Sequence, residues 1–210
     1  DGDGDLDIFV GGRVIPGRYP ESPRSYILEN DGNAHFVDVT ESVCPQIKES
    51  GMITDAVWLD IDKNGSQDLI VVGEWMPITI YINRSGILTD ETDRYLDKKY
   101  YGLWNSIDVG DFNGDGLPDL VMGNLGTNSQ FKASEEEPAE LYYADYDENG
   151  SVDPILNFYI QGKAYPYVTR NELLGQLANL RSRFTSYESF ADATMEDIFT
   201  PDELGRATKL

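Results

Sequence analysis

The sequence predicts an all-β fold built from short antiparallel strands, with a short α-helical tail at its C-terminal end. Three observations lead to this prediction. An acidic nine-residue motif recurs along the chain, a short apolar run rich in β-branched residues follows each copy, and Gly- and Asn-containing turn signals separate the runs. Repeated units of this kind indicate a repeat architecture, in which each unit buries its apolar face against the next unit.

Composition narrows the class of protein. The chain has 210 residues, 38 acidic against 16 basic side chains and a formal charge of −22, while 40% of its residues are hydrophobic. Such a chain can fold, but it offers no basic surface for nucleic acid. It contains no apolar run long enough to span a membrane. One cysteine and one histidine exclude an internal disulfide framework, a Cys-based zinc site and a His-rich metal site.

The acidic motif has the frame D-x-[DN]-x-[DN]-G-x-x-D. Complete copies occupy residues 60–68, 111–119 and 145–153, and the opening DGDGDLD fits the same frame without its first two positions. Because the chain opens inside a motif, we expect it to be a piece of a longer protein. Any leader would then lie outside this segment.

This frame is typical of a calcium-binding turn. Oxygens at positions 1, 3 and 5 converge on one point when the glycine at position 6 lets the backbone curl, and clustered hard oxygens suit calcium. An EF-hand would need Glu at position 12, but that position holds Val71, Met122 and Leu156. The last carboxylate instead falls at position 9. The alternative interpretation is a set of solvated Asx-rich turns without metal.

Strands are expected on both sides of each acidic turn. The expected strands are 6–12, 24–29, 35–40, 54–61, 68–75, 78–83, 86–90, 103–110, 119–124, 140–146, 154–161 and 164–168. Four antiparallel strands in each repeat of about 40–60 residues are typical of a propeller blade. Residues 1–168 are therefore predicted to form about three blades of a calcium-stapled β-propeller, too few to close a ring.

Residues 169–210 are predicted to form a helical insertion or cap. Thr169 and Glu172 match a capping box, and Leu173, Leu174, Leu177, Leu180 and Phe184 follow on one helical stripe. Thr200, Pro201 and the acids after them indicate a second helix start.

The repeats resemble a known family. The acidic loop followed by D-L-x-V-x-G is similar to the FG-GAP/VCBS repeats of integrin-α-like propellers. Residues 25–42, SYILENDGNAHFVDVTES, resemble the N-x-G-x-F-x-D-V-T strand pair of the branch that contains cartilage acidic protein and UnbV-like proteins. The resemblance implies a seven-bladed extracellular propeller, held together by calcium and involved in binding or adhesion.

The resemblance also implies the calcium ligands of all four loops. They are Asp1, Asp3 and Asp7; Asp60, Asp62, Asn64 and Asp68; Asp111, Asn113, Asp115 and Asp119; and Asp145, Asp147, Asn149 and Asp153.

The function expected from these observations is non-catalytic. We expect a calcium-binding module, secreted or on a surface lipoprotein of the cell envelope, that binds an unknown protein or glycan. His35 has no Ser or Cys partner motif, and repeated loops do not give carboxylates the distinct environments that catalysis needs. Two alternatives stay open: a propeller-based glycan hydrolase or lyase, and a purely structural spacer of a larger envelope protein.

Overall fold

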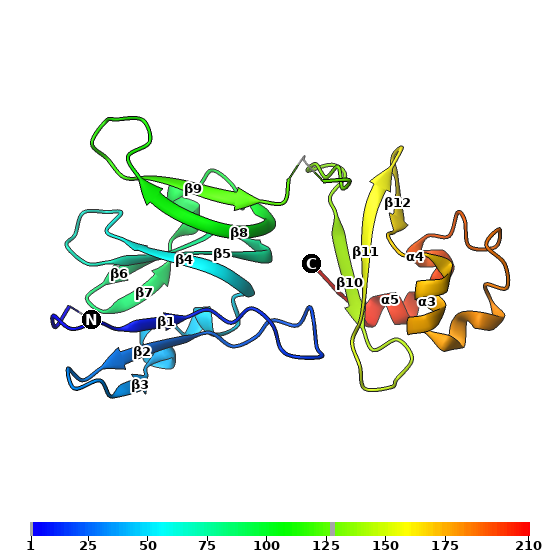
Figure 1. Ribbon diagram of the computed structural model, residues 1–210, viewed down its shortest axis with the longest axis horizontal. Coiled ribbons are helices and arrows are strands. Elements are labelled where there is room, and N and C mark those ends of the chain that lie inside the picture. Colours follow the sequence, from blue (N-terminus) through cyan, green and yellow to red (C-terminus); the bar gives the residue numbers. More distant parts are fainter. Residues whose placement is uncertain (1, 127–128) are drawn as a thin grey trace. The chain divides into compact units, whose positions relative to one another are not determined.

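The computed structural model describes residues 2–126 and 129–210, which form two compact units (Figure 1). The first unit comprises residues 1–15 and 21–125, and the second comprises residues 16–20 and 126–210. The boundary expected at residue 168 lies inside the second unit, where strands and tail helices share a core. The predicted ligand Asp1 lies outside the described residues.

The described residues of the first unit form nine strands and three short helical segments. They are β1 (Ile8–Val10), β2 (Tyr26–Asn30), β3 (Phe36–Asp38), α1 (Thr40–Val43), the 3₁₀ helix η1 (Pro45–Glu49), β4 (Met52–Leu59), β5 (Asp68–Pro77), β6 (Thr79–Arg84), β7 (Ile87–Asp90), α2 (Thr92–Tyr95), β8 (Tyr101–Gly110) and β9 (Asp119–Asn124). Each strand coincides with an expected one, with shifts of a few residues at the ends. The all-β fold class is therefore confirmed.

One complete antiparallel meander lies in the middle of the first unit. Strand β4 pairs with β5, β5 with β6, and β6 with β7. The meander β1-β2-β3 runs along one side of it, and the hairpin β8-β9, which also pairs with the end of β5, runs along the other (Figure 1). A four-stranded meander between two further sets of strands is consistent with a propeller-like segment.

Both faces of the middle meander are buried, which explains the unbroken apolar run at the start of β5. Leu69 and Val71 pack with Ile27, Cys44 and other residues of the first repeat. On the opposite face, Ile70 and Val72 form a second cluster with β8-β9 residues that include Ile107, Leu120 and Met122. Neighbouring repeats thus complete each other's cores.

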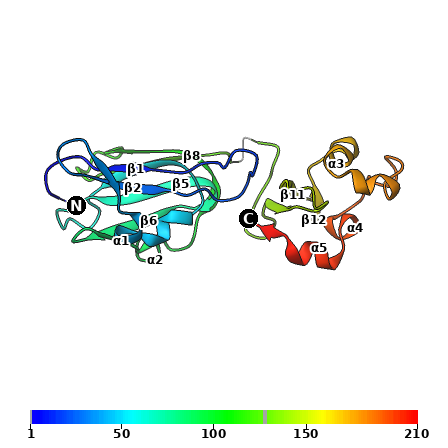
Figure 2. The ribbon, with the colours of Figure 1, turned by 90° about the horizontal axis from the view of Figure 1, so that it is seen from below.

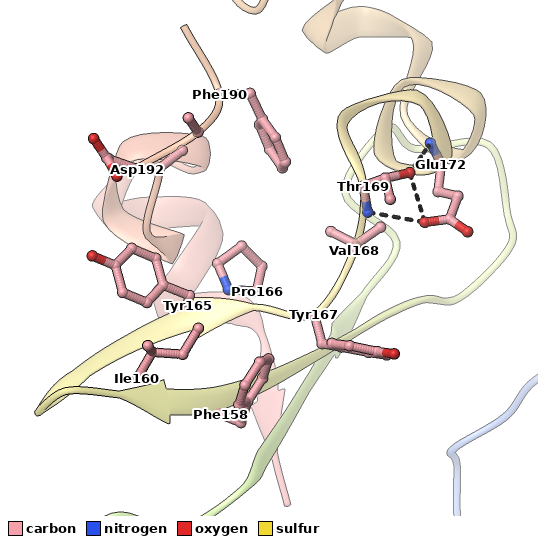
Figure 3. Close-up of a pocket in the computed structure, with 12 residues that line it drawn as sticks. Phe158, Ile160, Tyr165, Pro166, Tyr167, Val168, Thr169, Glu172, Phe190 and Asp192 are labelled. Atoms are coloured by element: carbon pink, nitrogen blue, oxygen red, sulfur yellow. Dashed lines mark hydrogen bonds between the residues drawn. The ribbon is translucent and has the colours of Figure 1, made fainter. Parts of the chain in front are cut away.

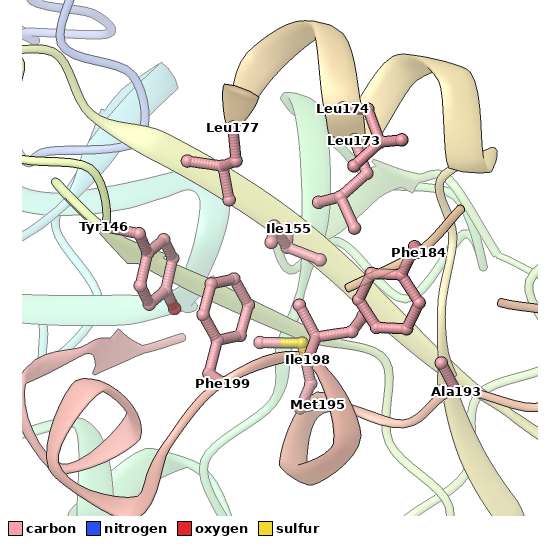
Figure 4. Close-up of a cluster of buried hydrophobic side chains, with 10 residues drawn as sticks. All are labelled: Tyr146, Ile155, Leu173, Leu174, Leu177, Phe184, Ala193, Met195, Ile198 and Phe199. Atoms are coloured by element: carbon pink, nitrogen blue, oxygen red, sulfur yellow. The ribbon is translucent and has the colours of Figure 1, made fainter. Parts of the chain in front are cut away.

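Over residues 16–20, 126 and 129–210, the second unit forms one four-stranded sheet, with strand order β12-β11-β10-β13. Its elements are β10 (Glu140–Ala144), β11 (Asp153–Ile160), β12 (Lys163–Pro166), α3 (Arg170–Gln176), the 3₁₀ helix η2 (Ala178–Ser182), α4 (Met195–Ile198), α5 (Pro201–Arg206) and β13 (Thr208–Lys209). Helix α3 and the segments after it cover one face of the sheet. There, Ile155 packs against Leu173, Leu177 and Ile198 (Figure 4).

Both predicted helix starts in the tail are confirmed. The Thr169 hydroxyl caps α3 in a complete capping box with Glu172, and Thr200 does the same for α5 with Glu203. The predicted stripe of apolar residues extends beyond α3. Helix α3 ends at Gln176, and Leu180 of the stripe lies in η2.

The strand expected to run to residue 40 ends at Asp38. The Asp38 carboxylate accepts hydrogen bonds from the backbone N–H and the hydroxyl of Thr40, which turns the chain into α1. Asp90 and Thr92 repeat this arrangement before α2. The two short helices lie on the same side of the first unit (Figure 2).

Candidate metal centres

The acidic loops share one backbone design. In each complete copy, the carboxylate at position 1 accepts hydrogen bonds from the backbone N–H groups of positions 5 and 6. The distances from the position 6 nitrogen to the position 1 Oδ2 are 3.0 Å for Gly65 to Asp60, 2.9 Å for Gly116 to Asp111 and 2.8 Å for Gly150 to Asp145. The sequence frame therefore dictates one loop conformation.

This conformation requires a left-handed backbone at position 6. Gly65, Gly116 and Gly150 have φ values of 89°, 82° and 86°, a region that glycine enters without steric cost. Gly4 occupies the same position in the truncated first loop and has a φ of 103°.

The aspartate at position 9 lies where the second strand of each hairpin begins. Its carboxylate accepts a hydrogen bond from the backbone N–H of position 2 in all three complete loops. The residue paired with it across the hairpin immediately precedes position 1; these pairs are Leu59–Asp68, Gly110–Asp119 and Ala144–Asp153. Asp68 and Asp153 are buried, whereas Asp119 is only half-buried.

The third strand of a repeat also contacts the position 9 aspartate, a contact that the sequence analysis did not predict. The backbone N–H of Asn83, on β6, donates to Asp68 Oδ1 at 2.7 Å, and that of Asn30, on β2, donates to Asp7 at 3.0 Å. The Asn83 side chain also donates to the carbonyl of Gln67 and accepts from Gly86 N–H. An Asn shortly before a Gly in the turn after a third strand is the signal that could have identified both asparagines.

A threonine that follows the fourth strand of a repeat is hydrogen-bonded to the third strand. The hydroxyl of Thr92 accepts from the backbone N–H of Ile80 at 2.9 Å, and that of Thr40 accepts from Ile27 at 2.8 Å. Both threonines are buried. The D-V-T segment quoted for the resemblance therefore fastens the strand that supports the acidic loop.

Three carboxylates converge in two of the loops. Among the described residues, the oxygens of Asp60, Asp62 and Asp68, and those of Asp145, Asp147 and Asp153, form groups whose members lie within 4.8 Å of one another. Two oxygens at about 2.3–2.6 Å from one calcium ion can be at most about 5 Å apart. Each group could therefore hold one metal ion.

The third and first loops do not form such a group within the described residues. In the third loop, Asp111 and Asp115 are exposed, and the Asn113 amide nitrogen lies 3.4 Å from Asp119 Oδ1. In the first loop, Asp3 is at position 5 and Asp5 is at position 7. The Asp3 carboxylate accepts from the Asp5 backbone N–H at 3.1 Å, and the position 5 side chain of every complete loop accepts the same bond from position 7.

The fourth loop has the electrostatics of a cation site. Burial raises the pKa of the Asp153 carboxyl, and Asp147 and Asp145 add to this effect, whereas hydrogen bonds from Tyr146 and Gln176 oppose it. Asp147 Oδ1 is buried and has no hydrogen-bond partner among the described residues. A buried carboxylate oxygen without a donor is costly unless a cation satisfies it, so the residues present fit a metal ion.

The second unit also has a hollow of about 600 Å³, beside β12 and the segment after α3 (Figure 3). Aromatic side chains, among them Phe158, Tyr165, Tyr167 and Phe190, line much of it. The rings of Phe158 and Tyr167 pack edge to face, with centroids 5.5 Å apart. Two acids, Glu172 and Asp192, also line it.

Fold and loops together define a class: an antiparallel β-repeat protein whose repeats place an acidic turn between their first two strands. A family model described as FG-GAP-like repeat matches residues 1–71 and 60–122, which is more than half of the chain. The chain belongs to this family. The fourth loop lies beyond the matched residues. No curated protein and no solved structure matched the chain in the other two comparisons. No helix in the described part of the chain has the length and apolarity to cross a bilayer.

Proposed function

We propose that the chain is a calcium-binding, non-catalytic segment of an extracellular or cell-envelope β-propeller that binds a protein or glycan. The observation that carries this proposal is the convergence of three carboxylates in both the second and the fourth loop. The all-oxygen donor sets favour calcium, because calcium accepts flexible geometry and a larger number of oxygen ligands than magnesium.

The role of the ion is structural. Asp60 and Asp62 precede the turn glycine and Asp68 opens β5, so one ion between them fixes the hairpin that starts the repeat. It also relieves repulsion among the three carboxylates, in a chain whose formal charge is −22. The third strand would be held as well, because Asp68 accepts from Asn83.

Family membership supports the extracellular setting, since FG-GAP-like repeats are consistent with adhesion-type propellers. Extracellular modules commonly bind calcium with dissociation constants of about 0.1–1 mM, a range that is filled outside the cytoplasm and not inside it. A loop design of modest affinity therefore works where calcium is abundant.

The aromatic hollow of the second unit supports a binding role for that unit. Of its aromatic side chains Tyr167 is exposed, whereas Phe158, Tyr165 and Phe190 are half-buried. Aromatic side chains at a surface hollow offer stacking surfaces for a sugar or for an apolar side chain of a protein. Glu172 does not have the character of a general acid, because hydrogen bonds from Thr169 hold its pKa below the usual range.

Calcium titration of the full chain by calorimetry tests the proposal. We expect binding that 1 mM magnesium displaces poorly, and the loss of one site in Asp60→Ala and of another in Asp145→Ala. Unchanged stoichiometry in both variants would overturn the ligand assignment. A glycan and protein array should retain the chain without turnover, whereas released reducing ends would indicate the hydrolase or lyase.

A further inference from the structure

The turn after the third strand faces the acidic loop in both of the first two repeats. In the second repeat, Asn83 bonds Asp68, and the next residue is Arg84. In the first repeat, Asn30 bonds Asp7, and the next residue is Asp31. Burial, Asp3 and Asp7 raise the pKa of Asp5 in the first loop, and Asp31 adds to this effect. The residue after the asparagine is thus placed to change the electrostatics of the loop, and its charge is opposite in the two repeats.

Arg84 already contacts a carboxylate of the second loop. Its Nη1 lies 3.3 Å from Asp62 Oδ2, and Asp62 belongs to the converging group. The same guanidinium donates two hydrogen bonds to the Glu91 carboxylate, from Nε to Oε1 at 2.9 Å and from Nη2 to Oε2 at 3.0 Å. Arg94 donates to Glu91 as well, at 2.9 Å. Arg84 is therefore anchored on Glu91 and reaches the loop with its remaining nitrogen.

We infer that Arg84 sets the calcium affinity of the second loop: it pairs with Asp62 in the empty loop and weakens the binding of calcium. This inference rests on the proposed calcium binding. A divalent ion at the centre of the loop must compete for Asp62 with a charge that Glu91 holds close by, and it is repelled by that charge. When calcium binds, Arg84 gives up Asp62 and keeps its two bonds to Glu91.

The fourth loop lacks this competitor among the described residues. Asp147 Oδ1 is buried and has no hydrogen-bond partner in the part of the chain that the structure describes. The ion pair beside the loop joins Arg206 to Glu148, which is outside the converging group. The two loops therefore differ in affinity, and the fourth loop fills at a lower calcium concentration than the second.

The test is a calcium titration of the full chain carrying Arg84→Gln, measured by isothermal titration calorimetry at low salt. The binding step that disappears in Asp60→Ala identifies the second loop. We expect Arg84→Gln to tighten that step about three- to ten-fold and to leave the fourth-loop step unchanged. Screening should reduce the gain at high ionic strength. Arg84→Lys keeps the positive charge but cannot make both hydrogen bonds to Glu91, and it should change the calcium affinity of the second loop less than Arg84→Gln does.

Arg94→Gln is the matched control, because Arg94 contacts Glu91 but has no contact with Asp62. An equal gain in Arg94→Gln and Arg84→Gln, or no gain in Arg84→Gln, would overturn the inference. If the unmodified chain binds no calcium in either loop, the proposed function fails instead, so the two failures are distinguishable. The Arg84 Nε resonance supplies an independent readout: it should shift as the second loop fills, and a constant resonance contradicts release from Asp62.

Discussion

The second and third acidic loops have the same sequence frame and the same backbone hydrogen bonds, yet they differ in burial. Asp68 is fully buried and bonded by N–H groups from Ile61 and Asn83, whereas Asp119 is half-buried and bonded by Phe112 N–H. The second loop connects two strands of a complete four-stranded meander. The third loop connects β8 to β9, and β9 is the edge strand of its sheet.

The difference separates local from tertiary causes. The turn forms wherever the frame D-x-[DN]-x-[DN]-G-x-x-D occurs, because its hydrogen bonds lie within nine residues. The two loops whose three carboxylates converge have Asp at positions 1, 3 and 9, whereas the third loop has Asn113 at position 3. In both converging loops a further element also contacts position 9: strand β6 in the second loop, and Gln176 of α3 in the fourth.

The largest expected effect comes from removing the supported carboxylate. Asp68→Ala leaves two half-buried N–H donors, those of Ile61 and Asn83, without their acceptor and removes a fully buried carboxylate ligand, and we expect it to lower the free energy of unfolding by about 3 kcal/mol in calcium. Asp119→Ala, the matched variant in the third loop, should cost about 1 kcal/mol. Urea unfolding of the full chain measures both. Equal losses would remove the distinction between the two loops.

Removal of calcium should have the next largest effect. An ion that binds only the folded state at 100 times its dissociation constant adds about 2.7 kcal/mol per site. We expect excess EGTA to lower the melting temperatures of the chain, and Asp60→Ala to abolish much more of this shift than Asp111→Ala does. Scanning calorimetry with and without EGTA measures the shift. A melting curve that EGTA leaves unchanged would contradict calcium stapling.

A smaller effect should follow from loosening the third strand. Thr92→Val removes the acceptor of the Ile80 N–H in a buried site, which should cost about 1–2 kcal/mol. We expect weaker calcium binding at the second loop with the third loop unaffected. Thr89→Val, on the same β7 strand but exposed, is the control. If Thr92→Val alters stability but not calcium affinity, the third strand does not support the loop.

The smallest expected effect on the free energy of unfolding comes from weakening α3, whose Gln176 contacts Asp153 of the fourth loop. Thr169→Ala removes the N-cap of α3 and should cost about 1 kcal/mol. Because Thr169 holds the pKa of Glu172 low in the folded state, this pairing stabilises the fold above the unfolded pKa of Glu. That contribution is lost as the pH falls through the folded pKa, and it should be missing in the variant. A pH series of unfolding curves that is parallel for both proteins would contradict the assignment.

The sequence predicted the strands and the tail helix starts because both are encoded locally. Alternating or continuous apolar runs bounded by Gly and Asn mark β1 to β12, and the pairs Thr169–Glu172 and Thr200–Glu203 mark α3 and α5. Strand β13 is two residues long and pairs only with β10, so no local pattern revealed it.

The candidate sites were predictable only in part. The motif marks every position 1, 3, 5 and 9 residue, but it gives the third loop the same weight as the second. Asn113 in place of Asp at position 3 is the difference that the motif does show. The supports of position 9, Asn83 and Thr92 for the second loop and Gln176 for the fourth, reach the loops through tertiary contacts that no spacing within the motif encodes.

The central claim is that the converging carboxylates hold calcium, and an anomalous difference map of the full chain crystallised with saturating calcium tests it most directly. We expect one strong peak between Asp60, Asp62 and Asp68, and another between Asp145, Asp147 and Asp153. Density for water alone at both centres would contradict the claim.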